Sequence, residues 1–365
     1  MINSTTQGLI CEAAVNISKV LLNLTENRSD TKYTEELICK REYNPNEDYR
    51  GRKKNTLVLS GTYVTLDKLP KAERVRNCGT FLSFEDKRLI RANFCRCRLC
   101  PMCMWRQSRS TAGQITKLMN YIAEEDTEAR FALLTLTQGR VPGGELTAEV
   151  GKVLKAWIKV TKLRGFEKLV KGFVRALEIT HDTEKKITKK MFNTKKRFYM
   201  SRGLTVGDIN PYYDTYHTHL HVIFDVNKQY SNRLRSEYTR LSENMEWSNW
   251  WRNSLGVDYS PVVDIRTFNK ERGHGAYELA KYVVKPDDYI YSDRGHMTET
   301  VRVLDAALFD RVLIAYAGSF RKARKALKLE DTMTDEMPED EKQTRRTSNW
   351  YWHFGYSQYR KMGEP

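Results

Sequence analysis

Two histidines separated by one residue, His219 and His221, have the spacing that could hold a metal ion on a β-strand. Side chains alternate between the two faces of a strand, so both imidazoles would point the same way. Two imidazoles suit a divalent cation, but two ligands seldom suffice, so a third is expected from a neighbouring strand. Taken alone, the pair also fits a chance arrangement on a strand edge. Apolar residues at the alternate positions would anchor the opposite face in a core: Leu220, Val222 and Phe224.

Glu178 is the candidate for the third ligand, because it lies opposite the predicted buried face of the segment GFVRALEIT. That buried face is formed by Phe173, Leu177 and Ile179. A His-His-carboxylate set with open positions suits Mg²⁺ or Mn²⁺ bridging a phosphate. His217 shares the face and is either a spare ligand or a residue at the frayed strand start. The other histidines are expected at the surface or in hydrogen bonds: His181, His274, His296 and His353.

A second chemical signal is the segment YELAKYVVK, in which Glu278 and Tyr282 lie one helical turn apart on the same face. A phenol is a poor nucleophile until its proton leaves, but a cation on the scissile phosphate makes in-line attack feasible. Tyr282 would then hold a 5′-phosphate and release a 3′-OH, with Glu278 as general base and Lys281 and Lys285 steadying phosphate charge. Taken alone, the segment also fits an ordinary amphipathic helix in which Tyr277 and Tyr282 are packing residues.

Five of the seven cysteines lie between residues 78 and 103, which in a reducing compartment favours metal binding over disulfides. Cys100 and Cys103 have the C-x-x-C spacing of a zinc knuckle. The four predicted Zn²⁺ ligands are Cys78, Cys95, Cys100 and Cys103, with Cys97 left free. Reduced thiols without metal, or a redox-active pair, are the alternatives.

The net charge of +16 favours a polyanionic partner over mere solubility or an anionic membrane surface, since no basic amphipathic helix is evident. The sequence has neither an apolar run of about 18 residues nor a signal-peptide pattern, so a cytoplasmic location is expected and no membrane contact. A long lysine-rich insert, which could form a basic hairpin, separates two predicted strands. Weak candidates for DNA and phosphate contacts are Lys281, Lys285, Lys189, Lys190, Lys195, Lys196 and Arg197.

Hydrophobic periodicity predicts the order β-α-β-β-α-β-α, which is an α+β fold with two helices on one face of an antiparallel, ferredoxin-like sheet. The predicted strands are 131–137, 172–180, 216–226 and 262–268, with a looser one at 56–66. The predicted helices are 9–24, 104–123, 147–163 with Thr147 as N-cap, 231–251, 275–285 and one from 301 to about 327.

These elements divide the chain into four predicted parts. They are an N-terminal region of unknown role (1–75), a zinc knuckle (76–105), a nuclease domain (106–300) and a helical and aromatic extension (301–365). An acidic run at 330–341 is expected to be a flexible loop.

The motifs together resemble the rolling-circle replication initiators of small Gram-positive plasmids, within the HUH endonuclease superfamily. The resemblance covers about residues 78–329. It rests on FCRCRLCPMCMWR, FALLTLT, HTHLHV and YELAKYVVK, which occur in the family's order.

The resemblance implies that His219 and His221 are the HUH pair, Glu178 the acidic ligand and Tyr282 the nucleophile. Glu278 would serve the terminating hydrolysis. It also implies nicking of a single-stranded or hairpin-borne origin and recruitment of a host replicative helicase of the UvrD/PcrA type, and it leaves a homodimer open. The alternatives are an HUH transposase or relaxase, or a non-enzymatic zinc-containing DNA-binding repressor.

Overall fold

The computed structural model of the 365-residue chain describes residues 43–228, 230, 241–267, 276, 279, 285–329 and 347–363. The predicted helix at 9–24 and the acidic run at 330–341 lie outside the described residues. Within the described part, no helix has both the length and the apolar character needed to cross a membrane.

The centre of the molecule is a five-stranded, wholly antiparallel sheet with the order β6-β3-β5-β4-β7. Its strands are β3 (Ala129–Pro142), β4 (Val170–His181), β5 (Thr215–Asn227), β6 (Val263–Thr267) and β7 (Ile314–Ala317). The first four, with α7 (Leu146–Thr161) between β3 and β4 and α12 (Leu241–Leu255) between β5 and β6, follow the ferredoxin-like β-α-β-β-α-β order. The predicted α+β class is confirmed.

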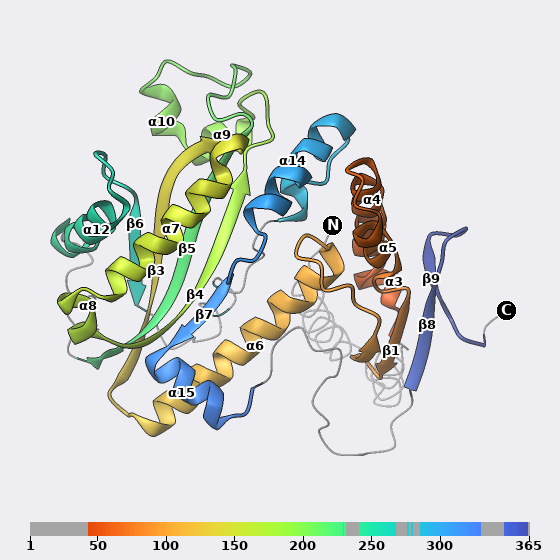
Figure 1. Ribbon diagram of the computed structural model, residues 1–365, viewed down its shortest axis with the longest axis horizontal. Coiled ribbons are helices and arrows are strands. Elements are labelled where there is room, and N and C mark those ends of the chain that lie inside the picture. The colour runs from red at the N-terminus through yellow and green to blue at the C-terminus, as the bar shows by residue number, and fades with distance from the viewer. Residues whose placement is uncertain are drawn as a thin grey trace, which may run out of the picture.

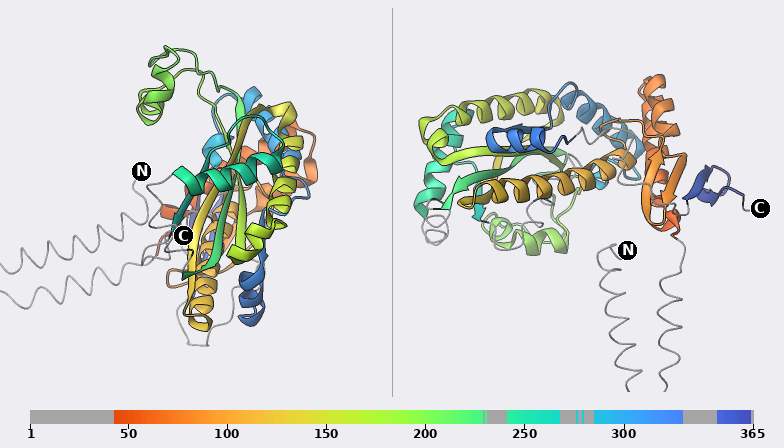
Figure 2. Two further views of the ribbon diagram at one scale, coloured as in Figure 1. Left: turned by 90° about the vertical axis from the view of Figure 1, so that its left-hand side faces the viewer. Right: turned by 90° about the horizontal axis from the view of Figure 1, so that it is seen from below.

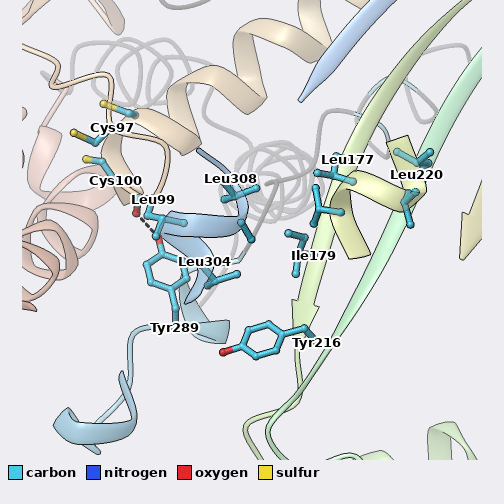
Figure 3. Close-up of a cluster of buried hydrophobic side chains, with 14 of the residues drawn as sticks. Cys97, Leu99, Cys100, Leu177, Ile179, Tyr216, Leu220, Tyr289, Leu304 and Leu308 are labelled. Atoms are coloured by element: carbon cyan, nitrogen blue, oxygen red, sulfur yellow. Dashed lines mark hydrogen bonds between the residues drawn. The ribbon is translucent and has the colours of Figure 1, made fainter. Parts of the chain in front are cut away.

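The two faces of this sheet bury two separate apolar clusters. Alternate residues of β3, Ala132, Leu134 and Leu136, are buried in the larger cluster, which includes residues of α7 and α12. Figure 3 shows Leu177 and Leu220 from β4 and β5 in the same cluster. The smaller cluster lies under α6 (Pro101–Glu125) and α15 (Gly318–Ala326), and α6 and α7 cover opposite sides of the sheet (Figure 2).

A second, four-stranded sheet lies at the end of α6 and has the order β2-β1-β8-β9 (Figure 1). Residues far apart in the sequence meet here, because Leu82 of β1 pairs with Trp350 of β8. The predicted boundaries at 75, 105 and 300 remain a prediction. The elements of this end are α3 (Pro45–Asp48), α4 (Arg50–Thr65), α5 (Leu69–Asn77), β1 (Phe81–Glu85), β2 (Arg88–Ala92), β8 (Thr347–His353) and β9 (Gln358–Lys361).

The strand predicted at 56–66 is wrong, because these residues form most of helix α4. Thr56, Leu59 and Tyr63 are buried at helical spacing, three and four residues apart. The pattern was misleading because buried positions include the polar residues Thr56, Ser60 and Thr62, whereas the apolar Val64 is exposed.

The single helix predicted from 301 to 327 is also wrong. The chain instead forms α14 (Arg294–Ala307), strand β7 and then α15. Asp310 and Gly318 have positive φ values of 50° and 55°, which interrupt a right-handed helix. β7 pairs with β4 and extends the central sheet by one strand.

Two smaller expectations also change. Thr147 lies inside α7 rather than at its N-cap, because the 3₁₀ turn η1 (Gly143–Glu145) leads directly into the helix. The connection after β4 is not a basic hairpin but carries two short helices, α9 (Lys189–Thr194) and α10 (Lys196–Met200). A further short helix, α8 (Arg164–Leu169), precedes β4.

Candidate active site and metal centre

One face of the central sheet changes from apolar to polar along three adjacent strands. At its apolar end, Phe131, Val174 and Ile223 belong to the smaller buried cluster. Further along the same face, register places Glu178 opposite His219. The predicted pairing of the two strands with aligned faces is therefore what the structure has, despite the long insert between them.

Glu178 and His221 form the centre of this polar region. The Nε2 atom of His221 lies 2.7 Å from Oε2 of Glu178, and both residues are buried. Burial alone would raise the pKa of Glu178, but the hydrogen bond to His221 and the nearby His219 and Lys285 hold it below its usual value. Nζ of Lys285 lies 3.8 Å from the other carboxylate oxygen. The carboxylate is thus kept ionised and available as a ligand.

His217 and His219 complete a row of three imidazoles on this face. The ring centroids are 4.1 Å apart for His217 and His219, and 6.1 Å apart for His219 and His221, whose rings are nearly parallel. Burial lowers the pKa of His219 to about 4 and that of His217 to about 3. Both are therefore neutral at physiological pH and carry a nitrogen lone pair. His217 lies inside β5 and is not frayed.

The donor set of Glu178, His219 and His221 fits a hard or borderline divalent cation such as Mg²⁺ or Mn²⁺. Its three ligand atoms are not gathered as tightly as those of the four-cysteine group or of the group formed by His181, Asp214 and His296. Oγ1 of Thr135, on β3, lies 3.2 Å from Nδ1 of His221 and orients that ring. Thr135 was not singled out from the sequence, although its motif FALLTLT places two threonines on one strand face.

Replacing Thr135 by valine is expected to weaken Mn²⁺ binding by about ten- to a hundredfold, because ligand histidines depend on such supporting hydrogen bonds. Binding is measured by titration with Mn²⁺. Thr137→Val is the matched control, since the Thr137 hydroxyl donates to the carbonyl of Val262 rather than to a histidine. Equal affinities in the two variants would contradict this role of Thr135.

Acidification is expected to destabilise the protein through His219, when no divalent ion is added. Its folded pKa of about 4 lies below the ordinary 6.5, so the unfolded chain binds this proton more tightly. The stability is present above pH 6.5 and is lost as the pH falls toward 4. Asp225 and Asp288, with pKa values raised to about 6 mainly by burial, act in the opposite direction.

The thermal midpoint of His219→Asn should therefore fall less than that of the unmodified protein between pH 6.5 and 4. Comparing the two profiles isolates the contribution of His219 from that of the carboxyl groups. Parallel profiles would show that its pKa is the same in the folded and unfolded chains.

The predicted tyrosine helix lies largely outside the described residues, which include neither Tyr277, Glu278, Lys281 nor Tyr282. Ala276 and Leu279 are described, and both are helical and fully buried in the smaller cluster, on the histidine face of the sheet. The expected burial of Leu279 against the sheet is confirmed.

The chain that follows this segment is anchored at Tyr289. It passes through the 3₁₀ turn η2 (Pro286–Asp288), and the buried Tyr289 hydroxyl then donates to the carbonyl of Leu99 (Figure 3). Leu99 lies between Cys97 and Cys100, so this bond joins the tyrosine-bearing segment to the cysteine cluster. Tyr289 was not identified from the sequence, where it is one of 20 tyrosines without a distinguishing pattern.

The cysteine cluster has sulfur–sulfur distances compatible with a tetrahedral metal site. The ligand atoms of Cys78, Cys95, Cys100 and Cys103 all lie within 4.8 Å of one another, and three of the sulfur–sulfur distances are 3.5–3.6 Å. A tetrahedral Zn²⁺ with bonds of about 2.3 Å sets its sulfurs about 3.8 Å apart. The group contains the four cysteines predicted from the sequence. Cys97 lies outside it, with Sγ 3.3 Å from Arg74.

Helix α4 supports the cluster, a contribution that the sequence did not reveal. Lys53 is completely buried, and its ammonium group donates to the carbonyls of Arg76 and Cys78. The Thr56 hydroxyl lies 3.7 Å from the sulfur of Cys100. A buried lysine beside these sulfur atoms would offset the negative charge of the thiolates that a bound metal requires, so α4 forms part of the candidate metal site.

The basic insert projects from the end of the central sheet, where α9 and α10 lie beyond β4 and β5 (Figure 1). Its predicted DNA-contacting residues are all exposed: Lys189, Lys190, Lys195, Lys196 and Arg197. In the cysteine region, Arg98 bonds the carbonyl of Leu308, and the guanidinium of Arg106 lies 4.7 Å from the ring centroid of Phe94.

Comparison with known proteins places these features in context. A family model described as a replication protein matches residues 86–361. The chain is 31% identical over 303 residues to a protein named "Protein rep" of Streptococcus pneumoniae serotype 2 (strain D39 / NCTC 7466), covering 80% of this chain and 83% of that protein. It is 28% identical over 350 residues to "Protein rep" of Bacillus amyloliquefaciens, covering 86% and 93%. No solved structure matches the chain.

Proposed function

Because this chain belongs to the replication-protein family of plasmid initiators, we propose that it starts rolling-circle replication by nicking one origin strand through a phosphotyrosine intermediate. The nick would be made in single-stranded or hairpin DNA. The observation that carries the proposal is the register of β4 and β5, which places Glu178 opposite His219 and in contact with His221.

In the proposed reaction the Tyr282 oxygen attacks the scissile phosphorus, a new phosphoester forms, and the 3′ oxygen leaves as a free hydroxyl. A Mg²⁺ or Mn²⁺ ion bound by Glu178, His219 and His221 would neutralise charge on the phosphate. Lys285 would add positive charge, since its ammonium group already lies beside Glu178. Glu278 would later accept a proton from the water that ends the round by hydrolysis.

The burial of Ala276 and Leu279 supports this assignment. Both residues pack in the apolar cluster that continues the histidine face, so they lie on the same side of the sheet as the histidines. Structural Zn²⁺ at the four cysteines, together with the Tyr289–Leu99 bond, would then hold the far end of the same segment. The exposed basic insert would contact DNA phosphates, and a host helicase would separate the DNA strands beyond the nick.

The test is adduct formation with an origin oligonucleotide in the presence of Mn²⁺, followed by mass spectrometry of the modified peptide. We expect a protein–DNA adduct on Tyr282, none in Tyr282→Phe, and an undiminished adduct in Tyr277→Phe. An adduct that persists in Tyr282→Phe would reject the assigned nucleophile. Binding without any cleavage would instead favour a non-enzymatic DNA-binding protein.

A further inference from the structure

A second cluster of metal-ligating side chains lies apart from the cysteines and from the histidine row. It joins the end of β4, the turn before β5 and the first turn of α14 through His181, Asp214 and His296. Oδ1 of Asp214 lies 2.9 Å from Nε2 of His181 and 2.8 Å from Nε2 of His296. The three ligand atoms lie within 4.8 Å of one another.

The hydrogen-bonding partners of His181 are the informative feature. Its Nδ1 atom lies 3.0 Å from the carbonyl oxygen of Asp288, and its Nε2 atom faces the carboxylate of Asp214. Both neighbours are acceptors, whereas a neutral imidazole has only one N–H to donate. If Nδ1–H donates to the carbonyl, the Nε2 lone pair points at a carboxylate oxygen. The lone pair and the carboxylate oxygen repel each other unless a cation binds to both atoms or the ring carries a second proton.

The surroundings of His181 disfavour the second proton. Its side chain is completely buried, and its ring stacks on Tyr216 with a centroid distance of 4.2 Å. Removing an imidazolium from water is costly, although the Asp214 carboxylate offsets part of that cost. By contrast, a metal-binding histidine commonly donates its other N–H to a backbone carbonyl, as His181 does to Asp288.

We propose that His181, Asp214 and His296 bind a divalent transition-metal ion of the zinc class. Two imidazoles and one carboxylate are a common ligand set for such ions, and water would complete the coordination. Ligand atoms bonded at about 2.1 Å to one ion lie about 3.0–3.4 Å apart, so binding would lengthen the two distances from Asp214 to the histidines by a few tenths of an ångström. Half of the Asp214 side chain is exposed, which gives the ion access from solvent.

The ion would fasten three separate segments at one point. His181 ends β4, Asp214 immediately precedes β5, and His296 lies in the first turn of α14. His181 also contacts the Asp288 carbonyl, which belongs to the turn that follows the tyrosine-bearing segment. The site therefore acts as a structural clamp beside the sheet. It does not depend on the proposed nicking reaction.

The test compares the zinc content of purified full-length variants, measured by inductively coupled plasma mass spectrometry after saturation with Zn²⁺ and desalting. His296→Gln keeps an N–H donor for Asp214 but is a poor ligand, and His353→Gln is the control at an exposed histidine of β8. We expect His296→Gln to bind about one ion per chain fewer, with His353→Gln unchanged.

Asp214→Asn provides an independent variant, and circular dichroism checks that each variant is folded. We expect the same loss as in His296→Gln, and an additional loss when Cys100→Ser is combined with either variant, because the cysteine cluster is separate. Unchanged zinc content in a folded His296→Gln or Asp214→Asn protein would overturn the proposal. The cluster would then be a hydrogen-bonded His–Asp–His group with a charged His181.

Discussion

His221→Asn is expected to lower the rate of origin nicking by about a thousandfold, because it removes a ligand whose ion contributes several kcal/mol to the charged transition state. His221 is the best-held of the three imidazoles. Its two ring nitrogens contact Thr135 and Glu178, and the ring is buried. The substitution also removes the hydrogen bond that keeps Glu178 ionised. The measurement is single-turnover cleavage of an origin oligonucleotide at saturating Mn²⁺.

His217→Asn is the matched control for that experiment. His217 lies on the same face of β5 two residues before His219, but it makes no contact with Glu178 that would place it in the proposed ligand set. We expect this variant to nick within about tenfold of the unmodified protein. If His221→Asn nicked as fast as His217→Asn, the assignment of His221 as a ligand would be wrong.

Cys100→Ser is expected to abolish Zn²⁺ binding at the proposed four-cysteine site and to unfold the unit built around β1, β2, β8 and β9. The binding free energy of a four-cysteine zinc site contributes on the order of 10 kcal/mol to folding, more than a small sheet supplies by itself. Cys100 is completely buried between Thr56 and Cys78, so water cannot enter to take the place of the lost sulfur ligand. Zinc content and thermal unfolding measure the effect.

Cys97→Ser is the control that shows whether metal binding depends on the group of four cysteines or on any thiol of this region. Cys97 is two residues from Cys95 and is also buried, yet it lies outside the group of four. The variant should therefore still bind Zn²⁺ at the proposed site and lose at most about 1 kcal/mol of stability. Loss of zinc from Cys97→Ser but not from Cys100→Ser would show that the ligand set was wrongly chosen.

The parts of the fold that were predicted from the sequence are strands in which apolar and polar residues alternate, because that pattern can be recognised within one short segment. β3, β4 and β5 each place apolar residues on one face, and this pattern predicted the face of Glu178 and His221. It predicted β4 and β5 to within two residues at each end, whereas β3 extends beyond the predicted 131–137 at both ends. The grouping of Cys78, Cys95, Cys100 and Cys103 was also predicted, because the crowding and spacing of the cysteines in the sequence already indicate it. Helix α4 was not, since its buried face includes polar residues such as Lys53 and Thr56.

The parts that could not be predicted depend on contacts between distant segments. Nothing near Trp350 indicates that its strand pairs with Leu82, and nothing near Tyr289 indicates that its hydroxyl bonds Leu99. His181 and His296 each fit a surface or hydrogen-bonding histidine on local grounds. Only the fold brings both onto Asp214, which takes a left-handed backbone conformation at φ 55°.

The pairing of β1 with β8 has a consequence for synthesis of the protein on the ribosome. β1 is made early and β8 near the end, so the first strand waits with one edge unpaired while most of the polypeptide is still being added. The central sheet, whose strands are nearer in sequence, is able to form during that interval. A nascent chain that stops before β8 therefore retains an open strand edge that invites aggregation.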